Sequence, residues 1–170
     1  MAASPWTEEL ERKMARTTGP GVTTLEQVKA VSGLEYLRRI IDGRLPRPPI
    51  ADTLSCYLVE ADPGRAVFQG TPRWEYLNPA GTVHGGWMAT LLDAAMACAV
   101  QTALQAGQGY TTVEFKLNLV RPVLPATGAV RAEGKVVNVG RTIATAEGRL
   151  LGEDGKLYAH GTETCLVISL

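Results

Sequence analysis

The sequence predicts an α+β fold in which a curved antiparallel β-sheet wraps around one long apolar helix. The first observation is the segment Trp87–Leu104, eighteen residues that carry a single charge, as is typical of a helix enclosed by protein. The second is a series of five or six segments with strand patterning on both sides of it, separated by turn residues. The third is that the apolar face of so many strands needs a partner layer, which this helix can supply.

The segments before the first strand are expected to lie outside this α+β unit. Residues 1–22 predict a loosely ordered extension that ends in a Gly-Pro-Gly sequence. Residues 23–50 predict short helices, because Thr24 and Ser32 each begin a capping box with a Gln or Glu three positions later. The Pro-rich stretch Leu45–Ile50 predicts a stiff, extended linker.

The main domain is expected to span residues 51–170 and to hold all the strands. Its clearest pattern is Thr112–Leu119, where apolar and polar side chains alternate and predict a half-buried antiparallel strand whose buried face runs from Val113 to Leu119. The order of strand pair, long helix and three-strand meander fits the architecture called the hotdog fold. The predicted strands are Leu54–Ala61, Arg65–Thr71, Thr112–Leu119, Ala129–Val139, Thr142–Leu151 and Leu157–Ile168, with Trp74–Leu77 as a further short candidate.

Composition excludes several classes of protein. With 17 basic and 17 acidic residues the net charge is zero, which argues against nucleic-acid binding. The three cysteines form no C-x-x-C pair and the two histidines have no ligand spacing, so we expect neither a metal site nor a disulfide framework. An acidic N-terminus without an apolar run predicts no signal peptide, and a cytoplasmic location is the default. Insertion of Trp87–Leu104 into a membrane would bury Asp93 at a cost of about 2.5–3.5 kcal/mol, so no membrane partner is expected.

Asp93 is the first candidate functional residue, because it is the one charge between Trp87 and Val100. A carboxylate in such an apolar segment is costly to bury unless it is paired or used. The alternative is a structural Asp whose oxygens accept hydrogen bonds from hydroxyls or backbone. Gly85 and Gly86 precede the helix, where free N–H groups and the helix dipole could hold a carbonyl oxygen that becomes an oxyanion. The alternative there is a structural Gly-Gly turn.

The spacing of these groups favours a site shared between two copies of the chain. Asp93 lies eight residues after Gly85, which is roughly 12 Å along one helix. One chain therefore cannot easily bring both groups to the same carbonyl. Two antiparallel copies of the helix across a twofold axis would place Asp93 of one beside Gly85 of the other.

Other polar residues near turns are weaker candidates. Asn78 and His84 flank the loop before the helix and could orient water or brace the glycine turn, or could simply be turn residues. The hairpin at Gly140-Arg141-Thr142 offers an N–H, a cation and a hydroxyl to a phosphate, although a Gly-Arg turn is common. His160 is interpreted as structural.

The pattern Asn78-x-x-Gly-x-x-His84-Gly85-Gly86, with Asp93 nine residues after the histidine, resembles the hotdog-fold acyl-CoA thioesterases of the phenylacetate-degradation type. The resemblance runs from about Gly33 to Leu170 and leaves the first twenty-odd residues outside. It also includes the segments Gly33–Gly43, Pro48–Ile50 and Val139–Ala144.

The resemblance implies roles for individual residues. Asp93 would be the nucleophile or the general base for water, and Gly85 would donate its N–H to the thioester carbonyl. His84 would support that turn, Asn78 would orient the thioester or the water, and Thr112 would help to hold the water. At Ala97 a more distant hotdog branch keeps a catalytic threonine, so this chain looks unlike that branch. The stretch implied to contact CoA is Gly140, Arg141, Thr142, Ile143, Ala144 and Thr145.

The expected function is therefore hydrolysis of a small, medium or aromatic acyl-CoA to the free acid and CoA. CoA is part of the substrate, and no metal or redox cofactor is expected. The resemblance implies at least a homodimer, with a homotetramer as the common assembly. Two alternatives remain open: a non-catalytic acyl-CoA-binding or sensing protein on the same fold, and a lyase or hydratase. Trp74, Trp87 and Met88 are candidates to line the acyl pocket.

Overall fold

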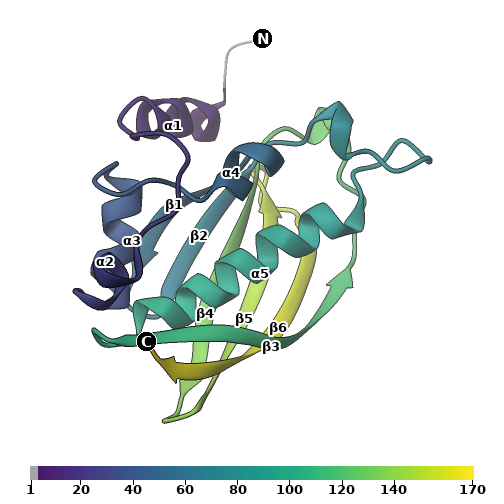
Figure 1. The fold of residues 1–170 in the computed structure, drawn as a ribbon. Helices are drawn as coiled ribbons and strands as arrows, with labels where there is room; N and C mark the ends of the chain where they lie inside the picture. Colours follow the sequence, from purple (N-terminus) through teal and green to yellow (C-terminus); the bar gives the residue numbers. More distant parts are fainter. Residues whose placement is uncertain (1–3) are drawn as a thin grey trace.

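The computed structural model describes residues 4–170 and has a six-stranded antiparallel sheet curved around helix α5 (Gly85–Thr102) (Figure 1). The strand order is β1-β2-β4-β5-β6-β3, so β3, which follows the helix in sequence, lies at the edge beside the C-terminal strand. This arrangement confirms the predicted α+β hotdog architecture. The strands are β1 (Cys56–Asp62), β2 (Arg65–Gly70), β3 (Gln108–Leu119), β4 (Val130–Val139), β5 (Ile143–Gly152) and β6 (Leu157–Ser169).

Helix α5 is buried because small and apolar residues surround its axis. Leu91, Leu92, Ala95 and Met96 are fully buried and pack against the concave face of the sheet. The backbone of β4 approaches closely at Gly134, where an added Cβ would lie 2.2 Å from the carbonyl oxygen of Ala95. Among residues 4–170, none of the helices combines the length and apolarity that crossing a lipid bilayer requires.

Two predicted segments have a different local structure. Residues Trp74–Tyr76 form a 3₁₀ turn, η1, and not a strand. The second half of the Pro-rich stretch is the start of helix α4 (Pro49–Leu54) rather than an extended linker. Proline suits the first turn of a helix because its missing N–H would have no partner there and its φ is already helical. The series of prolines therefore did not reveal the helix start at Pro49.

The N-terminal segment is helical and docked where a loose extension was expected. Helix α1 (Pro5–Met14) buries Leu10 against Val59 and Val67, on the sheet face opposite α5. The Arg131 guanidinium of β4 lies 4.6 Å from the ring centre of Trp6 and 2.6 Å from Glu9. These partners are more than a hundred residues apart in sequence, so local patterning carries no sign of them.

Of the two predicted capping boxes, the one at Thr24 forms in full, and the one at Ser32 forms only its N-cap bond. In α2 (Leu25–Lys29) Thr24 Oγ1 accepts from the Gln27 N–H, and Gln27 accepts from the Thr24 N–H. In α3 (Gly33–Ile41) the Ser32 hydroxyl accepts from the Glu35 N–H. Helix α3 lies beside β1 and the C-terminal end of α5 (Figure 1).

The apolar face predicted for Thr112–Leu119 is largely exposed in one chain. Val113, Phe115 and Leu119 are 61%, 43% and 50% exposed. A β-bulge between Thr112 and Glu114 shifts the pairing with β6, so the simple alternation does not continue through the strand. Because β3 is also the edge of the sheet, its outer side has no neighbouring strand within the described chain.

Candidate active site

The loop before α5 is held by Asn78 and by the cap of the helix. The Asn78 side chain donates to Thr82 Oγ1 (2.7 Å) and accepts from the N–H groups of Ala80 (2.9 Å) and Thr82 (3.2 Å). Asn78 is thus a turn residue, the alternative left open from sequence. It also lines a surface groove of about 270 Å³ together with Gly85 and Arg121, so its position is compatible with contact to a ligand.

His84 is the N-cap of α5, and its ring supports the glycine turn. His84 Nδ1 accepts from the Gly86 N–H at 2.9 Å, and the His84 N–H donates to the Tyr76 carbonyl at 2.8 Å. Gly85, the first residue of the helix, has an N–H with no acceptor among the described residues. The cap therefore uses the Gly86 donor and leaves the Gly85 donor for a ligand at the positive end of the helix dipole.

We expect His84→Ala to lower the free energy of unfolding by about 1 kcal/mol, because the mutation removes the N-cap acceptor. His84→Asn is the matched control, since asparagine is a favourable N-cap and should preserve most of the stability. Chemical denaturation of the two variants and the wild type measures the difference. Equal losses in both variants would contradict the capping role.

Asp93 lies two turns further along the helix, half-buried and facing β3. Its Oδ1 accepts from the Thr112 hydroxyl at 3.3 Å. Burial raises the pKa of the Asp93 carboxyl, and the Thr112 hydrogen bond partly offsets that rise. The structure thus brings together two of the predicted site residues. Asp93 and Gly85 of one chain stay two turns apart on one helix, as their spacing predicted.

Glu163, on β6, belongs to the same cluster, although the sequence analysis did not identify it. Its side chain is buried, 1% exposed, and its Oε1 lies 2.9 Å from Thr112 Oγ1 and 3.2 Å from Cys165 Sγ. Burial, with a further contribution from the charge of Asp93, raises the pKa of Glu163 to about 7. The available signal was its register: Glu163 shares the inward face of β6 with Ala159, Gly161 and Cys165.

The segment implied to contact CoA, residues 140–145, contains both exposed and buried residues in the structure. Arg141 and Thr142 are exposed at the β4–β5 turn, and Ile143 is 44% exposed. The Gly140 N–H is already used, because it donates to the Ile143 carbonyl at 2.8 Å. Ala144 is fully buried in the core, so its side chain cannot meet a ligand. Of the phosphate-binding groups proposed at this turn, the Arg141 cation and the Thr142 hydroxyl remain.

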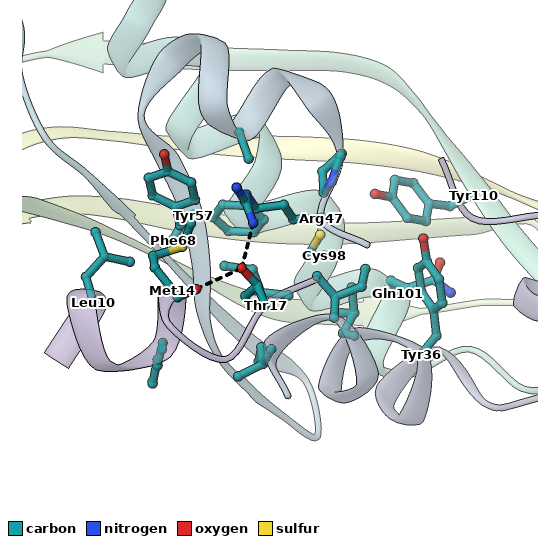
Figure 2. Close-up of a pocket in the computed structure, with 17 residues that line it drawn as sticks. Leu10, Met14, Thr17, Tyr36, Arg47, Tyr57, Phe68, Cys98, Gln101 and Tyr110 are labelled. Atoms are coloured by element: carbon teal, nitrogen blue, oxygen red, sulfur yellow. Dashed lines mark hydrogen bonds between the residues drawn. The ribbon is translucent and has the colours of Figure 1, made fainter. Parts of the chain in front are cut away.

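An apolar cavity of about 230 Å³ lies between the N-terminal helices and the far end of α5 (Figure 2). Figure 2 shows Tyr36, Gln101 and Tyr110 at one end and Leu10 and Tyr57 at the other. Cys98 of α5 lies on the wall, and burial raises the pKa of its thiol to about 12, which keeps it neutral.

Arg47 is a charged residue of the cavity lining (Figure 2), and its charge is compensated. It donates to both carboxylate oxygens of Asp52, at 2.6 and 2.9 Å, and to Thr17 Oγ1 at 2.6 Å. The predicted pocket residues lie elsewhere: Trp74 is 81% exposed, and Trp87 and Met88 pack in the core. Sequence patterning missed the cavity because helices α1 and α3 form much of its wall.

Similarities to known proteins agree with this fold. Residues 80–159 match the thioesterase superfamily. The chain is 32% identical over 109 residues to a candidate esterase of Caenorhabditis elegans, covering 64% of this chain and 63% of that protein, just under two thirds of its length. It is 30% identical over 106 residues to a candidate esterase of Saccharolobus solfataricus, covering 62% and 74% of the two chains.

A solved structure of a thioesterase-type, phenylacetic acid degradation-related protein from Ralstonia eutropha superposes with a TM-score of 0.70. It is 31% identical to this chain, and the match covers 77% of this chain and 98% of the other. The sheet, the central helix and the glycine turn at its start define a hotdog-fold protein. The chain belongs to the thioesterase superfamily.

Proposed function

We propose that the protein hydrolyses acyl-CoA thioesters to the free acid and CoA. The observation that carries the proposal is the pairing, on one helix, of an unused Gly85 N–H at the positive end with a half-buried Asp93 carboxylate further along. The N–H would hold the thioester oxygen while it gains negative charge. Asp93 would act on the carbonyl carbon directly or remove a proton from the attacking water, and the thiol of CoA would leave.

The proposed site needs two chains. If two α5 helices lie antiparallel across a twofold axis, Asp93 of one chain meets Gly85 of the other, whereas one chain keeps them roughly 12 Å apart. The edge strand β3 supports such an assembly, because it exposes Val113 and Phe115 and, among residues 4–170, no strand pairs with its outer side. We therefore propose at least a homodimer, with a tetramer as a further stage of assembly. Arg141 and Thr142 are proposed to contact the CoA phosphates.

The acyl group is proposed to enter the apolar cavity. Cys98 on its wall lies five residues after Asp93 on α5, and Tyr110 lies two residues before Thr112 on β3. The cavity is thus lined by α5, which carries Asp93, and by β3, which carries its partner Thr112. An apolar cavity of about 150 Å³ is enough to bind benzene. A volume of about 230 Å³ therefore supports an aromatic or medium-length acyl group.

Hydrolysis is tested with a panel of short, medium and aromatic acyl-CoA thioesters, with detection of the free thiol and identification of the acid. We expect thiol release that is highest for the aromatic or medium-length members. Binding of acyl-CoA without thiol release would contradict the proposal and favour the non-catalytic binding protein. An acyl-CoA product that keeps its thioester would favour the lyase or hydratase.

We expect Cys98→Leu to narrow the cavity and to lower kcat/KM for aromatic acyl-CoA by at least about 10-fold, since one methylene group in a pocket is worth about 10–200-fold in discrimination. Activity on acetyl-CoA should change less than about 3-fold, because a short acyl group stops before the wall. Cys98→Ala is the matched control and should retain the aromatic substrate. A uniform loss across acyl lengths would place the acyl group elsewhere.

A further inference from the structure

Thr112 joins two carboxyl groups through one oxygen atom. Its Oγ1 lies 3.3 Å from Asp93 Oδ1 and 2.9 Å from Glu163 Oε1. A threonine hydroxyl carries one proton and can donate to one of these acceptors. For both contacts to be hydrogen bonds, the second proton must come from a carboxyl group. The geometry therefore fits two carboxyl groups that together hold one acidic proton.

Burial decides which carboxyl carries this proton. Glu163 is 1% exposed, and within residues 4–170 its Oε2 is a buried side-chain oxygen without a hydrogen-bond partner. An ionised carboxylate in that position would lack the donors that a buried charge requires. Asp93 is only half-buried. The proton therefore belongs on Glu163, and the pKa of about 7 caused mainly by its burial agrees with this assignment.

The groups around Glu163 favour the neutral acid. On its own strand Cys165 Sγ donates to it, and on α5 the nearest charge is the anionic Asp93. On β3 the charged neighbour is Glu114, also an anion. The neighbouring strand β5 places Ala146 opposite Glu163. None of these facing groups is a cation.

Two further titratable groups near this cluster are neutral. Burial raises the pKa of the Cys98 thiol to about 12 and raises the pKa of the Tyr110 phenol well above its usual value. Neither group therefore supplies a charge that would stabilise an ionised Glu163.

We propose that Glu163 is a positioning residue for Asp93. The protonated Glu163 carboxyl donates a hydrogen bond to the Thr112 oxygen, and the Thr112 hydroxyl is thereby directed to donate to the Asp93 carboxylate. The inference rests on the proposed hydrolysis, in which Asp93 reacts. With Glu163 protonated, Asp93 is the one anion of the pair, and one of its oxygens is fixed by Thr112. The other oxygen is then left for the carbonyl carbon or for water.

Loss of the Glu163 proton would undo this arrangement. The Thr112 hydroxyl would then turn toward the new carboxylate at 2.9 Å and away from Asp93 at 3.3 Å. A second negative charge beside Asp93 would also favour its protonation. Activity is therefore expected in the range where Glu163 is protonated and should decline as the pH rises through the pKa of about 7.

The pH dependence of kcat/KM in the full-length protein tests the proposal. We expect the wild type to lose activity above about pH 7, and Glu163→Gln to keep activity within about 5-fold at pH 6 without that decline, because the amide donates to Thr112 at every pH. Glu163→Leu should be less active at pH 6 than Glu163→Gln and should also lack the decline, since leucine neither donates to Thr112 nor ionises. The control is Glu114→Gln on the neighbouring exposed position, which should keep a decline that begins at a slightly lower pH, because the variant lacks the Glu114 charge that helps to raise the pKa of Glu163. An unchanged decline in Glu163→Gln would overturn the proposal.

Infrared difference spectroscopy supplies a readout that does not need turnover. The wild type should show a protonated carboxyl band that disappears between about pH 6 and 8, and Glu163→Gln should lack it. Absence of this band in the wild type would overturn the proton assignment. A wild type that shows the band but releases thiol from no thioester would contradict the proposed function, and with it the link to Asp93, while confirming the shared proton.

Discussion

Asp93→Asn is expected to lower kcat/KM for the best acyl-CoA substrate by about 10²–10⁴-fold, the range for losing a positioned base or nucleophile. Asparagine has the same shape and can keep the contact with Thr112, but it neither attacks a carbonyl as an anion nor accepts a proton from water. Stopped-time assays of thiol release on purified variant and wild type measure the change.

The fold should tolerate this substitution. Burial raises the pKa of Asp93, so the charge is less favourable in the folded chain than in water, and its removal leaves the core packing intact. We expect the variant to have the oligomeric state of the wild type and a thermal midpoint at or above it. Retention of near-wild-type turnover would remove Asp93 from the mechanism, whereas loss of the folded oligomer would show a structural role.

Local patterns were enough to predict the main elements of the fold. The uniform apolarity of α5 reflects its burial on all sides. The short turns between the later strands reflect contacts within a few residues. The predictions that differ have physical reasons of another kind. Proline at 49 can begin a helix as well as stiffen a linker, and the bulge at Thr112 interrupts an alternation that the sequence alone shows as continuous.

The candidate site likewise contains residues that local sequence reveals and others that it does not. Asp93, Gly85 and His84 stand out because they are unusual for their local environment: an acid in an apolar helix and two glycines with a capping residue at its start. Glu163 does not, since an acid in an alternating strand is assigned to solvent unless its register is known. The pairing of Thr112 with Cys165 fixes that register and turns Glu163 inward. The cavity depends on the docking of α1 through Arg131, a contact between distant parts of the chain.

The cluster around Asp93 lowers the stability of the folded chain. Apolar residues at Asp93 and Glu163 would remove two desolvated acids and one unsatisfied oxygen from the interior. The helix already has a continuous apolar surface that such residues would extend. Two acids retained on facing elements, linked by one hydroxyl, are therefore better explained by chemistry than by stability.

Gly85→Pro is expected to lower kcat by about 10²–10³-fold, the usual cost of removing one oxyanion donor. Proline deletes the N–H at the first helical position, where it is otherwise well tolerated. The preceding His84 has φ −61° and ψ 136°, extended values that suit a residue before proline. Gly85→Ala is the control, because it keeps the N–H and introduces the same Cβ, 2.7 Å from the flexible end of Leu119. Equal losses for both variants would show a steric effect rather than a missing donor.

Mixing the two inactive variants decides whether the site is shared. In a heterodimer of Asp93→Asn and Gly85→Pro, one of the two sites combines an intact Asp93 from one chain with an intact Gly85 from the other. Co-expression in equal amounts gives heterodimers as half of the dimers, so about a quarter of wild-type activity should return. If each chain held a complete site of its own, every site would carry one of the two mutations and activity would stay at the level of the separate variants. Because Asp93 and Gly85 lie two turns apart on one helix, flexibility of one chain cannot produce the recovery, and its observation would require a site built from two chains.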